Sequence, residues 1–214
     1  MTRRTVRGLV PVLLAASALT GCSSDADSDG GAKAEKSAGT PAGKGAKTAA
    51  EGGTVGGAGS GCELPVTFGL AKDWKPEAVQ PVAPDAELAE LFTQGPVDLV
   101  CEIDAKPAGH IGFLRVWQGK STNASPRATL EGFVKAEENT SEVTYTQVTA
   151  GKQAVTEVTY TFRSPLMDGP RLTHAFALST PEGPVVVHLG GLDAAEHKDM
   201  LPAYELAKKS VRLG

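Results

Sequence analysis

The chain has 214 residues, with 21 Lys and Arg against 25 Asp and Glu. Between Cys62 and Gly214 there are 14 basic and 20 acidic residues, so this part carries a net charge of −6. Because binding to nucleic acid and docking on anionic lipid both need clustered basic residues, this composition argues against both.

The N-terminus has the three-part pattern of a secretory signal. Three arginines in the first seven residues precede an apolar run, Leu9–Leu19, and the small residues Thr20-Gly21 follow it. This order predicts a signal peptide over residues 1–21. The run has about half of the roughly 20 apolar residues that a membrane-spanning helix needs, which argues against a transmembrane anchor. The pair Arg3-Arg4 partly fits a twin-arginine signal, so both export routes stay open.

Cys22 directly follows these small residues. The stretch Leu19-Thr20-Gly21-Cys22 resembles the lipobox of bacterial lipoproteins, in which the signal is cut before the cysteine and the thiol carries diacylglycerol. The resemblance implies that Cys22 is a lipidation site. It also implies that the mature protein is lipid-anchored at the extracytoplasmic face of the cell membrane. The alternative is a cleaved signal without lipid.

Residues 22–61 form a predicted tether that carries the lipidated cysteine at its start. From Ser23 to Gly61 the only large apolar residue is Val55. Such a segment cannot bury enough apolar surface to offset its ordering entropy, so we expect disorder. As a Gly-rich coil of 39 residues it spans roughly 34 Å on average. The remainder, residues 62–214, is long enough for one domain with its own core.

Cys62 and Cys101 are the two cysteines of this domain. An even number of cysteines in an exported domain predicts a disulfide, which would contribute roughly 4 kcal/mol through loop closure. Two free buried thiols are the alternative. A zinc site is not expected, because no histidine flanks either cysteine in ligand spacing.

The first half of the domain predicts a mixture of strands and helices. Its expected elements, in chain order, are a strand at Val66–Leu70 with a turn ending on Trp74, a short helix capped by Asp85, strands at Val97–Ile103 and His110–Gln118, and a helix from Pro126 to about Asn139. Apolar residues on both sides of the strand His110–Gln118 indicate a sheet that is covered on both faces.

Two hairpins and a helix follow. The first hairpin joins 143–149 to 153–163 with Tyr145 opposite Thr156, and the second joins 172–180 to 185–192 with Thr180 opposite Val185. The last helix begins at the capping residue Asp193. These elements predict an α+β domain: an antiparallel sheet of about six to seven strands flanked by helices on both faces.

This order of elements resembles the PsbP-like fold, and most of all the LpqN-type lipoproteins of actinobacterial cell envelopes. The matching landmarks are Phe68, Trp74, Gly151 with Ala154, and the closing Ser210-Val211-Arg212. The resemblance covers residues 62–214 and implies an α/β/α sandwich. Related domains, the photosystem II extrinsic protein and a Ran-binding import factor, act by contacting other proteins. The resemblance therefore implies a binding module without an active site.

No motif in the domain predicts catalysis or a cofactor. Gly119-Lys120-Ser121-Thr122 imitates the end of a phosphate-binding loop, but Leu114 stands where that motif needs glycine. The predicted register places His174 and His188 on opposite faces of one sheet, where they cannot share a metal ion unless the register slips by one residue. No Gly-x-Ser-x-Gly elbow occurs in the domain, which argues against serine hydrolysis.

Trp74 and Trp117 are the two candidate groove residues. Large aromatic side chains belong more often to a core than to a ligand platform. If both were partly exposed around one groove, a peptide, glycan or lipid site would follow. We predict a non-catalytic binding or adaptor module with an envelope protein or lipid as its partner. The alternatives are a carrier of a small apolar ligand, which needs a closed apolar cavity, and an envelope hydrolase, which needs titratable groups converging in a cleft.

Overall fold

The computed structural model describes residues 46–83, 85, 88–165 and 169–214. The predicted signal peptide, the lipidation site Cys22 and residues 22–45 of the predicted tether lie outside this part. Among the described residues, no helix is both long and apolar enough to cross a lipid bilayer.

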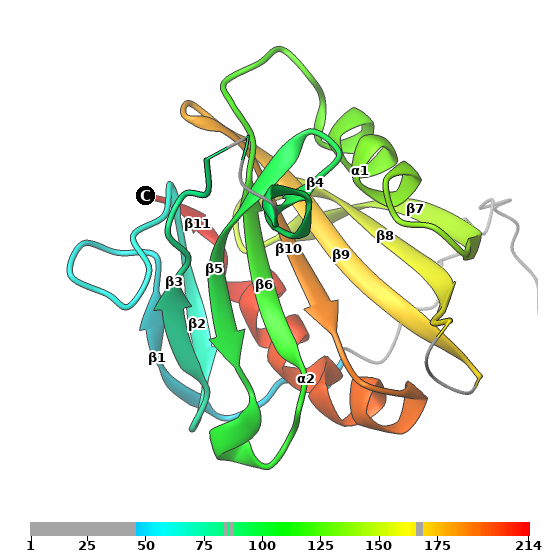
Figure 1. Ribbon diagram of the computed structural model, residues 1–214. Coiled ribbons are helices and arrows are strands. Elements are labelled where there is room, and N and C mark those ends of the chain that lie inside the picture. Colours follow the sequence, from blue (N-terminus) through cyan, green and yellow to red (C-terminus); the bar gives the residue numbers. More distant parts are fainter. Residues whose placement is uncertain (1–45, 84, 86–87, 166–168) are drawn as a thin grey trace, which may run out of the picture. The chain divides into compact units, whose positions relative to one another are not determined.

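The larger of two sheets has eight strands and is antiparallel throughout (Figure 1). Its strands are β3 Lys75–Ala78, β4 Thr93–Gln94, β5 Val97–Asp104, β6 Phe113–Gln118, β7 Thr140–Ala150, β8 Gln153–Arg163, β9 Pro170–Thr180 and β10 Gly183–Gly190. Seven of them lie in the order β3-β5-β6-β10-β9-β8-β7, and β4 pairs with the beginning of β5.

A smaller sheet and two α-helices complete the described part. The smaller sheet has the order β1-β2-β11, with β1 Glu51–Val55, β2 Val66–Ala71 and β11 Arg212–Leu213. The α-helices are α1 Pro126–Lys135 and α2 Ala194–Ser210, and two short 3-10 helices, η1 Ala89–Phe92 and η2 Lys106–Ala108, lie in the connections.

Helix α1 covers part of one face of the large sheet, over β8, β9 and β10. Its first turn is capped by Ser125, whose hydroxyl accepts a hydrogen bond from the Ala128 amide at 3.1 Å. Its apolar stripe is spaced to face the sheet, and the resulting core contains Leu130, Phe133, Val134, Trp117, Val158, Tyr160, Ala175, Ala177 and Val186.

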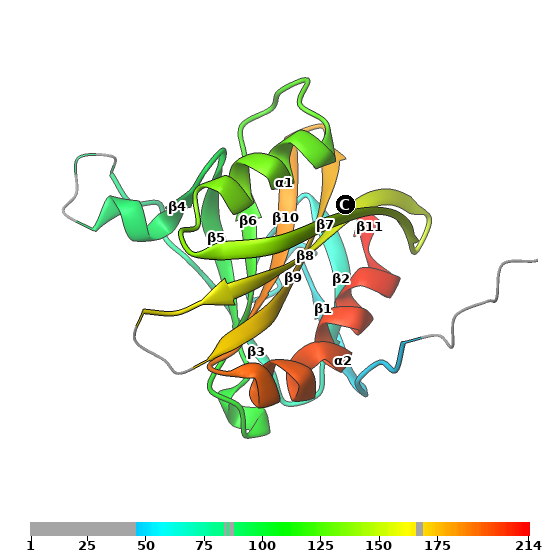
Figure 2. The same cartoon turned by 90° about the vertical axis from the view of Figure 1, so that its right-hand side faces the viewer.

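Helix α2 and the smaller sheet together cover the opposite face (Figure 2). The Asp193 carboxylate caps α2 by accepting hydrogen bonds from the amides of Ala195 and Glu196, both at 2.9 Å. Pro202 lies inside this helix. The core on this face includes Val66, Phe68, Phe176, Leu178, Val187, Leu189, Met200 and Tyr204.

The predicted α+β class with an antiparallel sheet is confirmed, but the layers differ from the prediction. A second sheet shares the cover of one face with α2, so that face is not covered by helices alone. The large sheet also has more strands than expected. Strands β3 and β4 carry no alternating apolar pattern that a sequence prediction can use, and they form because they pair with the edge of β5.

The boundary predicted between tether and domain at Cys62 is wrong. Strand β1 lies inside the segment that was expected to be disordered, and it pairs with β2. Its last residue, Val55, is completely buried. The Ala49 amide also donates a hydrogen bond to the Pro202 carbonyl at 2.9 Å. Composition misled here, because the order of this Gly-rich strand comes from pairing with β2 rather than from its own side chains.

The predicted disulfide between Cys62 and Cys101 is confirmed. The two Cα atoms lie 6.0 Å apart, and both residues belong to the core on the α2 side. The bond connects the segment after β1 to β5, so it joins the smaller sheet's layer to the large sheet.

Both hairpins form, with registers that differ from the predicted ones by two residues. Tyr145 lies opposite Val158 rather than Thr156, and Thr180 lies opposite Gly183 rather than Val185. Because side chains alternate with a period of two, a shift of two residues leaves every side chain on its predicted face. The prediction that His174 and His188 occupy opposite faces is therefore confirmed despite the shift.

Candidate functional site

Trp74 and Trp117 do not line a shared groove. Their exposed fractions are 7% and 5%, and they belong to the two separate cores on opposite sides of the large sheet. Trp117 packs edge-on against Phe133 at 5.6 Å between ring centroids. The groove proposed for these two residues is corrected: both are core residues.

The histidines lie in two different polar groups. His174 from β9 and His197 from α2 stack on the α2 side, with His174 Nδ1 and His197 Nε2 2.8 Å apart. Burial lowers the pKa of His197 to about 4 and also lowers the pKa of His174. No group of three metal-ligating side chains occurs in the described part of the chain. This histidine pair was missed because its second member comes from a distant helix.

A largely buried ionic cluster lies on the same side. Lys208 Nζ is 2.6 Å from Glu157 Oε1 and 2.7 Å from Glu205 Oε1, and the Tyr204 hydroxyl donates to Glu157 at 2.8 Å. We call these four residues the Lys208 cluster. Its donors and acceptors are matched, so the cluster serves to hold α2 against β8.

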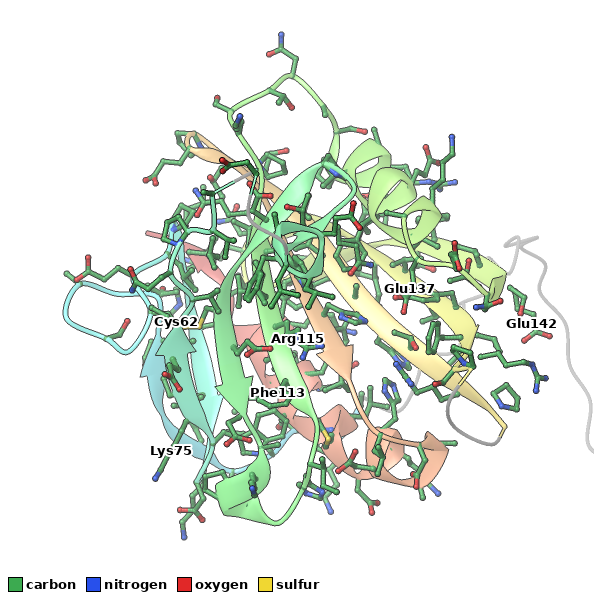
Figure 3. The ribbon with its side chains drawn as sticks, viewed as in Figure 1. Cys62, Lys75, Phe113, Arg115, Glu137 and Glu142 are labelled. Atoms are coloured by element: carbon green, nitrogen blue, oxygen red, sulfur yellow. A yellow bond between two sulfur atoms is a disulfide. The ribbon has the colours of Figure 1, made fainter. Side chains whose placement is uncertain are left out.

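The opposite face of the large sheet carries a polar pocket where α1 does not cover it. Its floor is formed by the neighbouring strands β6, β10 and β9. Between β6 and β10, Arg115 lies opposite His188 and Phe113 lies opposite Gly190; between β10 and β9, His188 lies opposite Ala175. Figure 3 shows Phe113, Arg115 and Glu137 on this face of the sheet. We call it the sheet pocket; it has a volume of about 270 Å³ and is lined by Gln94, Ile111, Gly112, Phe113, Arg115, Glu137, Arg171, His188, Gly190, Gly191 and Leu192.

Two arginines are held in this pocket by aromatic rings. Arg115 lies over the Phe113 ring at 5.1 Å, and its Nε donates to Glu102 at 2.7 Å. Arg171 lies over the Phe162 ring at 4.4 Å, directly across from it in the β8–β9 ladder. The Arg171 Nε is buried and has no hydrogen-bond partner among the described residues. Stacking fixes the planes of both guanidinium groups and leaves donor capacity on Arg171.

Three titratable groups meet beside these arginines. The Tyr160 hydroxyl donates a hydrogen bond to Glu137 Oε2 at 2.5 Å, and His188 Nε2 lies 3.4 Å from the same hydroxyl. Burial raises the pKa of Glu137 and, with the neighbouring Glu137, raises the pKa of Tyr160. Burial lowers the pKa of His188 to about 3, and the nearby guanidinium groups act in the same direction.

The hydrogen-bond pattern assigns the tautomer of His188. Because the Tyr160 hydroxyl gives its only hydrogen to Glu137, it can only accept from His188 Nε2. The neutral ring therefore carries its hydrogen on Nε2, and Nδ1 is an acceptor. Nδ1 is buried and has no partner within the described residues.

Sequence reasoning found none of this pocket's residues as a site. In the sequence, Tyr160, Arg171 and His188 stand at alternating strand positions like ordinary strand residues, and Glu137 follows a helix end as a solvated acid would. The available signal was the repeated placement of charged or polar residues on strands of a sheet that was expected to be covered on both faces. Their convergence depends on the order of strands in the sheet.

Comparison with known proteins identifies a family. Residues 32–211 match the model of a family described as uncharacterised lipoprotein. No curated protein matches the chain. The match covers most of the sequence, including the described two-sheet domain. The chain belongs to this family of lipoproteins.

Proposed function

We propose that the protein is a lipoprotein anchored through Cys22 at the extracytoplasmic face of the membrane, whose folded part is a non-catalytic binding module. Membership of a lipoprotein family supports the anchor. The antiparallel sheet with α1 on one face is consistent with the PsbP-like fold that we propose for this domain. The binding site that we propose is the sheet pocket.

One observation carries the binding proposal: unpartnered polar atoms lie on the face of the sheet that holds this pocket, and two of them belong to lining residues, Arg171 and His188. Five buried side-chain nitrogen or oxygen atoms of the described residues have no hydrogen-bond partner, and three of them, Arg171 Nε, Thr173 Oγ1 and His188 Nδ1, lie on this face of β9 and β10. Each such atom costs about 1–3 kcal/mol when it stays unsatisfied. A bound polar ligand would supply the missing partners.

The carrier of an apolar ligand is less well supported. A larger pocket of about 590 Å³ is lined by residues 79–82, 89, 92, 93, 98–100, 118–120 and 182. It lies against the connection from β3 to β4 and borders the core on the α1 side through Val79, Phe92 and Leu99, but no residue of α1 or α2 lines it. The interior next to α1 and α2 is filled by the two cores. A carrier needs an apolar cavity in such an interior.

A hydrolase is the second candidate, because Glu137 and His188 line one pocket, both lie next to the Tyr160 hydroxyl, and all three groups have shifted pKa values. The chemistry of these groups favours binding. A tyrosine with a raised pKa is a poor nucleophile, and Thr173 Oγ1 has no base within hydrogen-bond reach in the described structure. Turnover of nitrophenyl esters or nitrophenyl glycosides by the purified protein, abolished by Glu137→Gln, would establish the hydrolase instead.

The experiment that tests the binding module is crosslinking in intact cells followed by recovery of the anchored protein. The wild type is compared with Cys22→Ala, which removes the anchor, and with Arg171→Met, which removes the unpartnered donor. A component recovered with the wild type and lost from Arg171→Met supports the sheet pocket as the binding site. Equal recovery with the wild type and Arg171→Met contradicts it.

A further inference from the structure

We infer that the sheet pocket binds a neutral, multiply hydroxylated ligand, namely a single ring of a saccharide. This inference rests on the proposed binding function and names its ligand class. It follows from the charges that line the pocket, the kinds of hydrogen bond left open, and the shape of the floor.

The charges in the pocket are balanced. Arg115 is paired with Glu102 at 2.7 Å, and Arg171 shares the pocket with Glu137. The low pKa of His188 keeps its ring neutral at physiological pH. A ligand with a net charge of either sign would therefore meet a group of its own sign, whereas a neutral ligand meets both without repulsion.

The pocket has both a donor and an acceptor without a hydrogen-bond partner among the described residues. Of the lining residues, Arg171 has an unpartnered donor, Nε, and His188 has an unpartnered acceptor, Nδ1. A carboxylate or a fully ionised phosphate group can only accept, so it leaves His188 Nδ1 without a partner. A hydroxyl group both donates and accepts, so neighbouring hydroxyls on one rigid ring match the donor and the acceptor at once.

The floor of the pocket has room because residue 190 is a glycine. A Cβ atom built there would lie 3.8 Å from Arg115 Nη1 and 3.9 Å from His188 Cε1, which are ordinary contact distances. The missing side chain therefore leaves space between a donor and the histidine ring. A pocket of about 270 Å³ is slightly smaller than the sites that hold drug-sized ligands, and has room for about one ring.

An extended peptide fits the same pocket less well. Strands β6, β10 and β9 are interior strands, so their backbone groups are already paired on both sides. A peptide could not add to them as a further strand, and only side chains remain to recognise it. A saccharide needs only side-chain hydrogen-bonding groups to be recognised, and this pocket presents such groups.

The test is saturation-transfer NMR on the full chain carrying Cys22→Ala, so that no detergent is needed. The probes are glucose, galactose, mannose and N-acetylglucosamine with their linear oligomers up to hexamers. Acetate and acetamide test whether the pocket instead binds a carboxylate or an amide group. We expect transfer to ring hydrogens of at least one saccharide and none to acetate.

Two variants locate that binding. Gly190→Ala places a methyl group in the floor without a clash, and Arg171→Lys keeps the charge but loses the planar fork; each should weaken binding by about tenfold or more. The matched controls are Gly53→Ala, where an added methyl group meets nothing within 4 Å, and Arg163→Lys on the exposed end of β8. Both controls should bind as the wild type does.

The inference is overturned if no saccharide gives a signal, or if Gly190→Ala binds as tightly as wild type. It is also overturned if acetate or acetamide binds in an Arg171-dependent way while the sugars do not. If crosslinking still shows an Arg171-dependent partner in any of these cases, the binding function stands and only the saccharide assignment fails.

Discussion

Replacing His188 by glutamine should reduce the fall in the free energy of unfolding that the protein undergoes as the pH is lowered from 7.5 to 5. The His188 side chain is 5% exposed, packs edge-on against Phe133 at 5.4 Å, and has its pKa lowered by burial to about 3. In the unfolded chain its pKa returns to about 6.5. Between these two values the unfolded chain binds a proton that the folded protein does not.

The sign and size of the effect follow from this difference. Because the unfolded state holds more protons between pH 6.5 and 3, the free energy of unfolding falls as the pH falls through that window. The slope approaches about 1.4 kcal/mol per pH unit for one group. At pH 5 the contribution of His188 should be about 2 kcal/mol less favourable than at pH 7.5, where the ring is neutral in both states.

The assay is urea unfolding, followed by circular dichroism, at pH steps from 7.5 to 4.5. His188→Gln should be less stable than wild type at pH 7.5, because the packing against Phe133 is lost. That deficit should shrink by about 2 kcal/mol on going to pH 5. Glu137, whose pKa is raised by burial, acts in the opposite sense as pH falls, but it is present in both proteins and cancels to first order in the difference.

The matched control is His110→Gln in the loop before β6, outside the sheet pocket. This variant should keep the pH profile of the wild type. Parallel profiles for the wild type and His188→Gln across the whole range would refute the reasoning, because they would mean that burial does not keep this ring neutral.

Three further predictions concern stability. Replacing Cys62 and Cys101 by alanine should lower the free energy of unfolding by about 4 kcal/mol, because the bond closes a sequence separation of 39 residues; thermal melting of the reduced wild type should agree. Lys208→Met leaves the buried Glu205 and the largely buried Glu157 without their cation and should lower the free energy of unfolding by about 3 kcal/mol. Lys198→Met on the exposed face of α2 should lower it by less than about 0.5 kcal/mol; both are measured by urea unfolding. Asp193→Ala removes the cap of α2 and should lower the free energy of unfolding, measured in urea, by about 1 kcal/mol. No change would mean that this end of the helix does not depend on its cap.

The elements that the sequence predicted well are those with strong local signals. Pro126 marked the start of α1, and Asp193 marked the start of α2. Alternating apolar residues located both long hairpins and the faces of their side chains, although each register was displaced by two residues. A period of two fixes the face of a strand residue but not its partner.

Features that depend on non-local pairing were missed. Strand β1 is built from Glu, Gly, Thr and a single valine, and only its pairing with β2 reveals it as part of the fold. The sheet pocket was missed for the same reason, because Glu137, Tyr160 and His188 are far apart in the chain and meet through the order of strands. Trp74 and Trp117 were candidates only because aromatic residues are conspicuous in a sequence, and their burial removes them from any surface site.

The sheet pocket as the binding site is the central claim, and it is tested most directly by Gly190→Ala in the anchored protein in intact cells. Crosslinked products of this variant are compared with those of wild type and Gly53→Ala. The account predicts that the component captured by wild type and Gly53→Ala is lost from Gly190→Ala, since the added methyl group occupies the floor of the pocket. Capture of the same component by Gly190→Ala at the wild-type level would contradict it.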